Sequence, residues 1–282
     1  MKKVFVPAVL ILLMVSCSND ETINTLQTQG VVINRDRVIA YFPKNSIPEN
    51  RMNEIVDTLN LGITLADKYL GGPYDWQVFK NKQLTYYFCE GNFMSTTSKE
   101  GDIFIPVWRA QSNQSPWLHE TMHILLRSVN GNWNPKSNPM NLFKMPMWLT
   151  EGMAEFLAIK ISYEYQIPKF DIFESGGLSK VDSICNISVR QENGPHILKY
   201  IGEPGIMIKL YTKKRRSYAP TFYNCSCSFT KYLVETYGLD KVLNAYTNYK
   251  KEIKTIEEFT GKKMNELRED WLTKIKQKED YS

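Results

Sequence analysis

Two histidines four residues apart enclose a glutamate in the segment His119-Glu120-Thr121-Met122-His123. Because an α-helix repeats about every 3.6 residues, His119 and His123 lie on one helical face, one turn apart. Two imidazole nitrogens at that spacing can hold one Zn²⁺, and Glu120 lies where it can reach a water on the metal. The segment predicts a zinc-dependent hydrolase. The alternative is an amphipathic helix whose polar residues face solvent.

A catalytic zinc site normally takes three protein ligands and leaves a further position for water, so one more ligand is needed. The segment 147–156, Met-Trp-Leu-Thr-Glu-Gly-Met-Ala-Glu-Phe, places two carboxylates one helical turn apart in an apolar run. Glu151 is the predicted third ligand, and Gly152 beside it permits close approach of another helix. Glu155 is predicted to accept the outer N–H of a ligand histidine. The two roles can also be reversed, and a pair of solvated glutamates is the alternative.

The elements that position these residues are predicted from hydrophobic periodicity and turn residues. Strands are predicted at 38–42, 83–89 and 102–108, and helices at 50–70 and 147–165. The helix that carries the histidines is predicted to begin with Ser115 as N-cap and Pro116 in its first position. Residues 130–144 are rich in Asn, Pro and Gly and are predicted to be loop.

The N-terminus has the pattern of an export signal. Lys2 and Lys3 precede an apolar run, Val4 to Val15, which is too short to span a bilayer. The run ends in Val15-Ser16-Cys17-Ser18, which resembles a bacterial lipobox and predicts cleavage before Cys17 and lipidation of that cysteine. An ordinary secretory signal with a chance cysteine is the alternative.

The predicted organisation has three parts. Residues 1–16 are a lipoprotein signal peptide, 17–36 are the lipidated cysteine and a polar, flexible tether, and 37–282 are one domain that carries both metal motifs. The mature chain is then expected outside the cytoplasm, anchored by lipid to a bacterial membrane and facing the periplasm or the cell surface.

Charge and cysteine content add two expectations. The formal net charge of +5 is too small to favour nucleic acid as the main partner, and the basic run at 213–216 is predicted to be a solvated loop. Apart from Cys17 the cysteines are Cys89, Cys185, Cys225 and Cys227. Four cysteines allow three complete pairings, which the sequence does not distinguish, so each is expected to be a disulfide or a buried thiol.

The two metal motifs together resemble the gluzincin metallopeptidases, in the peptidase MA-like branch. The resemblance lies in His119-Glu120-x-x-His123 followed by Trp148-Leu149-x-Glu151-Gly152-x-Ala154-Glu155, and the segments at 227–243 and 259–271 are similar to the helical tail of these proteins. The resemblance implies an α+β fold with an N-terminal mixed β-sheet, the zinc helix, a mainly helical C-terminal lobe and an active-site cleft between sheet and lobe.

The chain departs from that family in two respects. Twenty-seven residues separate His123 from Glu151, more than in the aminopeptidases and thermolysin-like enzymes of this clan. The exopeptidase signature of the type Gly-x-Met-Glu-Asn is not found. An endopeptidase or a narrow specialist therefore fits better than a general aminopeptidase.

The resemblance implies peptide hydrolysis by a zinc-bound water that Glu120 activates, acting on a peptide or protein substrate. Tyr223 is the predicted donor to the oxyanion, with Tyr218 and His196 as alternatives. A second class of function is a non-catalytic lipoprotein that binds peptide or glycan on the same scaffold. A structural metal site is a third, although such sites are usually closed by four protein ligands.

Overall fold

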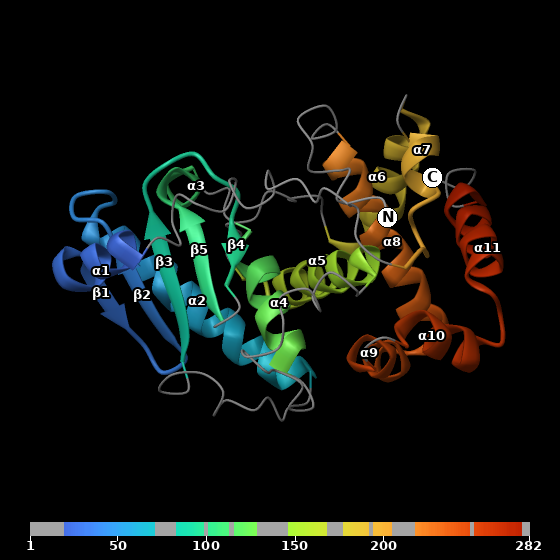
Figure 1. Cartoon of the computed structure of the whole chain (residues 1–282), viewed down its shortest axis with the longest axis horizontal. Helices are drawn as coiled ribbons and strands as arrows, with labels where there is room; N and C mark the ends of the chain where they lie inside the picture. The colour runs from blue at the N-terminus through green and yellow to red at the C-terminus, as the bar shows by residue number, and fades with distance from the viewer. Residues whose placement is uncertain are drawn as a thin grey trace, which may run out of the picture. The chain divides into compact units, whose positions relative to one another are not determined.

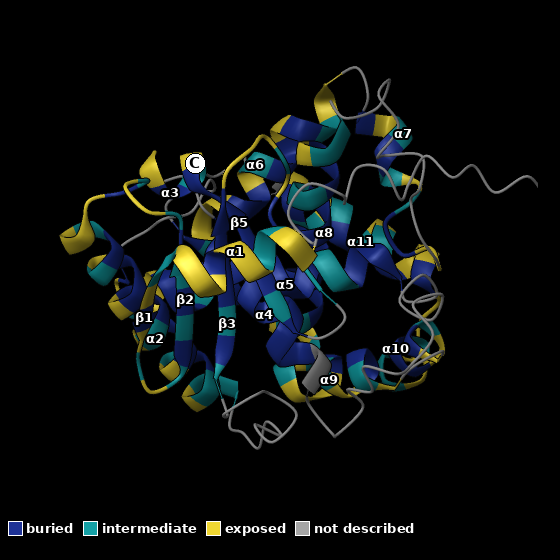
Figure 2. Cartoon of the chain, turned by 60° about the vertical axis from the view of Figure 1, so that its left-hand side comes forward, coloured by how far each residue is buried: buried dark blue, intermediate teal, exposed yellow. Residues whose placement is uncertain are grey.

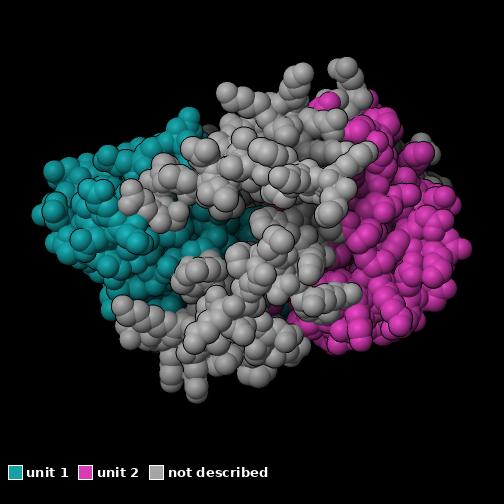
Figure 3. All heavy atoms as spheres, viewed as in Figure 1, with its two compact units in different colours: residues 1–124, 167–172 teal, residues 125–166, 173–282 magenta. Residues whose placement is uncertain are grey.

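The computed structural model describes nine stretches of the chain: residues 20–70, 83–98, 101–112, 116–128, 146–167, 177–191, 194–204, 218–248 and 251–277. The predictions made for the signal peptide, Cys17, Ser115, the loop at 130–144 and the basic run at 213–216 lie outside these residues. Two compact units divide the chain, coloured in Figure 3: unit 1 is residues 1–124 and 167–172, and unit 2 is residues 125–166 and 173–282. Among the described helices, none has both the length and the apolar character needed to cross a bilayer.

Unit 1 contains a five-stranded sheet in the order β1-β2-β3-β5-β4 (Figure 1). Its strands are β1 (Val31–Asn34), β2 (Val38–Phe42), β3 (Leu84–Cys89), β4 (Thr96–Thr97) and β5 (Asp102–Pro106). The central strand β3 runs parallel to β2 and β5, while β1 and β4 pair antiparallel at the two edges. The β-branched and aromatic residues of the three central strands explain why these segments extend. The sheet is mixed and the α+β class is confirmed.

One face of the sheet is covered by α1 (Asp20–Gln29). Successive side chains of a strand point to opposite faces, so Tyr87 and Cys89 share one face of β3. Leu26 of α1 is buried against Tyr87, Cys89 and Phe104. The amide of Gln27 also donates a hydrogen bond of 2.7 Å to the Tyr87 hydroxyl. These contacts fix α1 to the sheet.

The prediction of a flexible tether over 17–36 is therefore wrong for residues 20–34. They form α1 and β1, and β1 pairs with β2 through all four of its residues. The sequence of α1 is polar except for Ile23 and Leu26, so its apolar stripe was too narrow to signal a helix. A second correction concerns the predicted strand 102–108: it ends at Pro106, and α3 (Val107–Gln111) begins there.

The opposite face carries α2 (Glu49–Leu70) and α4 (Trp117–Ser128). Tyr86 lies on this face, one residue before Tyr87, and its hydroxyl is hydrogen-bonded to Thr121 of α4. The two helices contact each other at Gly62, where an added Cβ would lie 2.4 Å from the Trp117 ring. The indole therefore occupies the space that a side chain at position 62 would fill, and glycine is what allows α2 and α4 to approach.

Unit 2 is built around α8 (Ala219–Tyr237), which contacts most of the other described helices of the unit. These helices are α5 (Met147–Glu164), α6 (Leu178–Arg190), α7 (Gly194–Leu198), α9 (Leu239–Thr247), α10 (Glu252–Thr260) and α11 (Met264–Gln277). Three large aromatic side chains fill the centre: the ring of Phe229 lies 5.0 Å from Trp148 and 5.2 Å from Trp271. Helix α5 is buried along most of its length, as the dark blue ribbon in Figure 2 shows. An all-round apolar helix of this kind belongs in a core.

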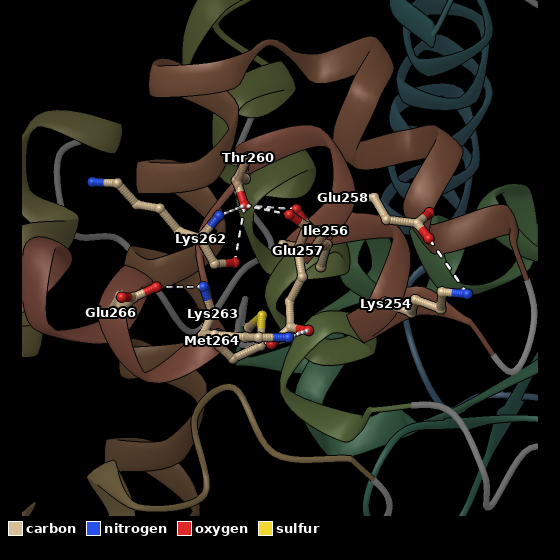
Figure 4. A network of polar contacts seen from close by, with 9 residues as sticks. All are labelled: Lys254, Ile256, Glu257, Glu258, Thr260, Lys262, Lys263, Met264 and Glu266. Atoms are coloured by element: carbon tan, nitrogen blue, oxygen red, sulfur yellow. Dashed lines mark hydrogen bonds and ion pairs between the residues drawn. The ribbon is translucent and has the colours of Figure 1, made fainter.

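The turn from α10 to α11 is fixed by polar contacts (Figure 4). Gly261 ends α10 in the left-handed conformation with φ of 70°, which glycine adopts without strain. The backbone N–H of Lys263 donates to Glu266 at 2.7 Å, and that of Met264 donates to Glu257 at 3.2 Å. The Lys263 ammonium, which also bonds Glu257, is the largest of the effects that lower the pKa of that carboxyl. These bonds satisfy two of the backbone donors at the start of α11, which have no partner within the helix.

The described cysteines fall into two groups. Cys89, at the end of β3 in unit 1, is buried with 1% of its surface exposed. Cys185, Cys225 and Cys227 are buried free thiols, all within unit 2.

Candidate metal centre

Helix α4 starts directly after Pro116, whose carbonyl accepts the backbone N–H of Glu120 at 3.0 Å. Proline suits this place because its fixed φ favours a helix start and a first-turn residue needs no N–H donor. The helix is then anchored by Trp117 against Gly62. His119, Glu120 and His123 follow on the same helix and are buried, with 7%, 8% and 6% of their surface exposed. Polar groups this buried require partners, and a metal would supply one for the histidines.

The two imidazoles converge at one point. The Nε2 atoms of His119 and His123 lie 3.0 Å apart, with ring centroids 4.6 Å apart and ring planes at 87°. Two nitrogens bound to one tetrahedral Zn²⁺ lie about 3.3 Å from each other, given the usual Zn–N bond length. The distance between the two nitrogens is therefore close to what a shared metal requires.

Glu151 of α5 completes a set of three donors. Its carboxylate and the two imidazoles each offer one ligand atom, and these atoms all lie within 4.8 Å of one another. The set therefore can hold a metal ion. Two imidazole nitrogens and one carboxylate oxygen are a donor set that fits catalytic Zn²⁺, because it leaves a coordination position for water. The three residues predicted as ligands are brought together as expected.

The other predicted site residues lie outside this set. Glu120 is buried beside His119 but is not among the three donors. Glu155 is 2% exposed, one turn after Glu151 on α5, and lies near Cys227 of α8. Burial raises the pKa of the Cys227 thiol, and the Glu155 carboxylate raises it further. The contact predicted between Glu155 and a ligand histidine stays a prediction.

The three candidates for the oxyanion donor all lie in unit 2. Tyr223 is half-buried on α8, with its ring 6.2 Å from that of Phe222. His196 of α7 is engaged by two aromatic rings: its Nε2 lies 3.4 Å from the Tyr200 hydroxyl, and its ring lies 6.1 Å from Tyr218. The choice of Tyr223 stays a prediction.

A buried hydroxyl pair within unit 1 was not anticipated from the sequence. The Thr121 hydroxyl donates to the Trp117 carbonyl at 2.6 Å, which uses its only proton. The Tyr86 hydroxyl, 2.5 Å from Thr121, must then be the donor to it. Burial, and to a lesser extent the nearby Glu120 carboxylate, raise the pKa of Tyr86, so the phenol keeps its proton. The residue that follows Glu120 is thus tied to strand β3.

We expect Tyr86→Phe to lower the free energy of unfolding by about 1 kcal/mol, because the buried Thr121 oxygen loses its donor. Urea unfolding followed by circular dichroism measures this change. Tyr163→Phe is the matched control, since Tyr163 is 58% exposed. An equal, small effect of both substitutions would contradict a stabilising role for the Tyr86 hydroxyl.

Gly152, the residue after Glu151, lies where α5 meets α8. A Cβ added there would be 2.3 Å from the Thr230 hydroxyl and 2.4 Å from the Ser226 carbonyl oxygen. The close approach expected at this glycine is thereby confirmed. Because one of the two atoms is backbone, α8 itself would have to move to accept a larger residue.

Gly152→Ala is expected to destabilise unit 2, although alanine is the better helix former. The gain in helix propensity is about 1 kcal/mol, whereas overpacking against backbone costs about 1–3 kcal/mol. Thermal unfolding of the single variant and of Gly152→Ala in a Thr230→Ala background measures the effect. Persistence of the loss in the double variant identifies the Ser226 carbonyl as the obstacle, and full recovery would show that only the Thr230 side chain is in the way.

Comparisons of the chain with protein-family models, with curated proteins and with solved structures find no match.

Proposed function

We propose that this protein is a zinc-dependent peptidase that hydrolyses peptide bonds, as an endopeptidase. The observation that carries the proposal is the donor set: His119 and His123 present Nε2 atoms 3.0 Å apart, and the Glu151 carboxylate lies within 4.8 Å of them. Glu120 follows His119 in the sequence, is buried and does not belong to this set. Three ligands with a separate carboxylate fit a catalytic metal better than a structural one.

His119, His123 and Glu151 would hold the metal. When bound, Zn²⁺ supplies a Lewis acid that lowers the pKa of a coordinated water to about 7 and polarises the scissile carbonyl. The Glu120 carboxylate accepts a proton from the attacking water and returns it to the nitrogen of the leaving amine. Tyr223 is the proposed donor to the oxygen of that carbonyl, and Glu155 the proposed partner of a ligand histidine.

We also propose that the site has the gluzincin-like, peptidase MA-like arrangement, with an active-site cleft. A further part of the proposal concerns the compartment in which the protein works. The Lys2-Lys3 start, the apolar run and the lipobox-like Cys17 support export and a lipid anchor to a bacterial membrane. A peptide or protein outside the cytoplasm is then the substrate class. Of the predicted tether at 17–36, residues 20–34 form α1 and β1.

Cleavage of a mixed peptide library by the purified protein tests the proposal. We expect cleavage that a zinc chelator abolishes and that added Zn²⁺ restores, because the donors keep their positions on α4 and α5. Metal content is measured on the same samples by elemental analysis. A protein that binds one zinc per chain yet cleaves nothing across the library would instead be a peptide- or glycan-binding protein.

A further inference from the structure

Two buried thiols contact each other where α6 and α8 pack together. The Sγ atoms of Cys185 and Cys225 lie 3.4 Å apart, and both residues are 0% exposed. A disulfide has an S–S length of about 2.0 Å, so the two sulfurs need to approach by only about 1.4 Å. A rotation of either side chain about its Cα–Cβ bond moves a sulfur by such a distance.

The contacts on each side of the thiols fix the register of the two helices. One turn before Cys185, the Asp182 carboxylate accepts a hydrogen bond of 2.9 Å from Ser228. One turn after it, the Ser188 hydroxyl accepts one of 3.0 Å from Asn224. Partner numbers fall along α8 as they rise along α6, so the helices are antiparallel with the thiols between two polar contacts.

A buried ion pair holds the same register. The Lys231 ammonium bonds Asp182 at 2.5 Å, and their side chains are 4% and 7% exposed. The Trp271 indole donates to the Ser228 hydroxyl at 2.9 Å, which links the pair to α11. Separating a buried ion pair leaves an uncompensated charge, so sliding of α6 along α8 is strongly disfavoured. Cys185 and Cys225 therefore stay opposite each other.

Cys227 provides an internal comparison. It is buried at 1% exposure on the same helix, two residues after Cys225. Two residues turn an α-helix through about 200°, so its thiol points away from that of Cys225. The Glu155 carboxylate of α5 lies near the Cys227 thiol, whereas the sulfur in contact with Cys185 is that of Cys225. The geometry thus selects one pairing among three chemically equal thiols.

We propose that Cys185 and Cys225 form a disulfide that joins α6 to α8 when the chain folds in an oxidising compartment. One thiolate attacks a sulfur of an external disulfide oxidant, such as oxidised glutathione, and releases one of its thiols. The second thiolate attacks the mixed disulfide and releases the other, so two electrons pass from the cysteines to the oxidant. This inference does not depend on the metal site.

Oxidation takes place before α6 and α8 are fully packed. In the folded state the hydrogen bond with Cys185, together with burial, raises the pKa of the Cys225 thiol. The folded protein therefore holds little thiolate at this position, and the oxidant has no access to a fully buried sulfur. Reduced protein that is already folded should react slowly, whereas protein refolding in the presence of the oxidant should react readily.

Refolding of the reduced, denatured full chain with reduced and oxidised glutathione tests the pairing. Free thiols are alkylated in denaturant, and the protein is digested without reduction for mass mapping. We expect a peptide pair that links Cys185 to Cys225, with Cys227 alkylated. Alkylation of Cys185 and Cys225, or a link from either of them to Cys89 or Cys227, would overturn the proposal.

Stability provides the second readout. Reducing the wild-type protein is expected to lower its urea midpoint by about 1 M, given the length of the loop that the bond closes. Cys227→Ala should retain this difference between oxidised and reduced samples. Cys185→Ala should lose the part of this difference that the bond between Cys185 and Cys225 contributes. Each variant is compared with itself, so a loss of core packing does not affect the result. An unchanged difference in Cys185→Ala would overturn the proposal.

Discussion

Glu120→Gln is expected to lower kcat for peptide hydrolysis by about 10²–10⁴, the usual contribution of a general acid–base group, while zinc stays bound. The substitution keeps the size and polarity of a side chain that is 8% exposed, so the packing of α4 is retained. It removes only the ability to accept a proton. Because Glu120 is not one of the three metal donors, the metal content should remain near one per chain.

Parallel measurements of kcat and of metal content separate this role from a structural one. The matched control is Glu164→Gln on α5, since Glu164 is 45% exposed and pairs with Lys160. The control should leave both values unchanged. If Glu120→Gln keeps its zinc and hydrolyses peptides like the wild type, the proposed role of Glu120 is wrong.

Glu151→Ala is expected to remove most of the bound zinc, whereas Glu155→Ala should only weaken binding. Glu151 supplies one of the three donor atoms, so its loss leaves two imidazoles as the protein ligands. Removing a side chain that supports a ligand typically costs about 10–100-fold in metal affinity, and removing a ligand costs more. Competition against a chelator of known affinity measures both changes.

Two results would change the assignment of the metal ligands or of the function. Loss of zinc in Glu155→Ala together with its retention in Glu151→Ala would mean that the two glutamates exchange roles. Wild-type protein that takes up no zinc after supplementation would argue against the peptidase. Binding of peptide or glycan would then be the function to pursue.

The sequence best predicted those features that depend on the spacing of residues within one helix or strand. The apolar residues of 50–70 recur at helical spacing, and α2 occupies Glu49–Leu70. The short apolar run at 38–42 predicted β2 with the same bounds. His119 and His123 face the same point because the helix period alone sets their separation. Glu151 was found because two carboxylates in an apolar run are unusual.

Long-range contacts were not predictable in the same way. Helix α1 depends on the packing of Leu26 against Tyr87, far along the chain, and its own sequence is polar. The hydroxyl pair of Tyr86 and Thr121 joins a strand to a helix, and nothing in the sequence indicates that these two residues are in contact. The choice of Cys225 over Cys227 as the neighbour of Cys185 follows from the register of α6 and α8, which only the folded helices define.

The topology of the sheet also bears on how fast unit 1 can fold. The central strand β3 is parallel to β2 and to β5, and parallel neighbours cannot be joined by a tight hairpin. Val38 must pair with Leu84, and Tyr86 with Ile103, before the sheet is stabilised. Contacts this distant in sequence raise the entropic barrier and slow folding. A chain synthesised from its N-terminus therefore cannot complete this sheet until β5 has emerged from the ribosome.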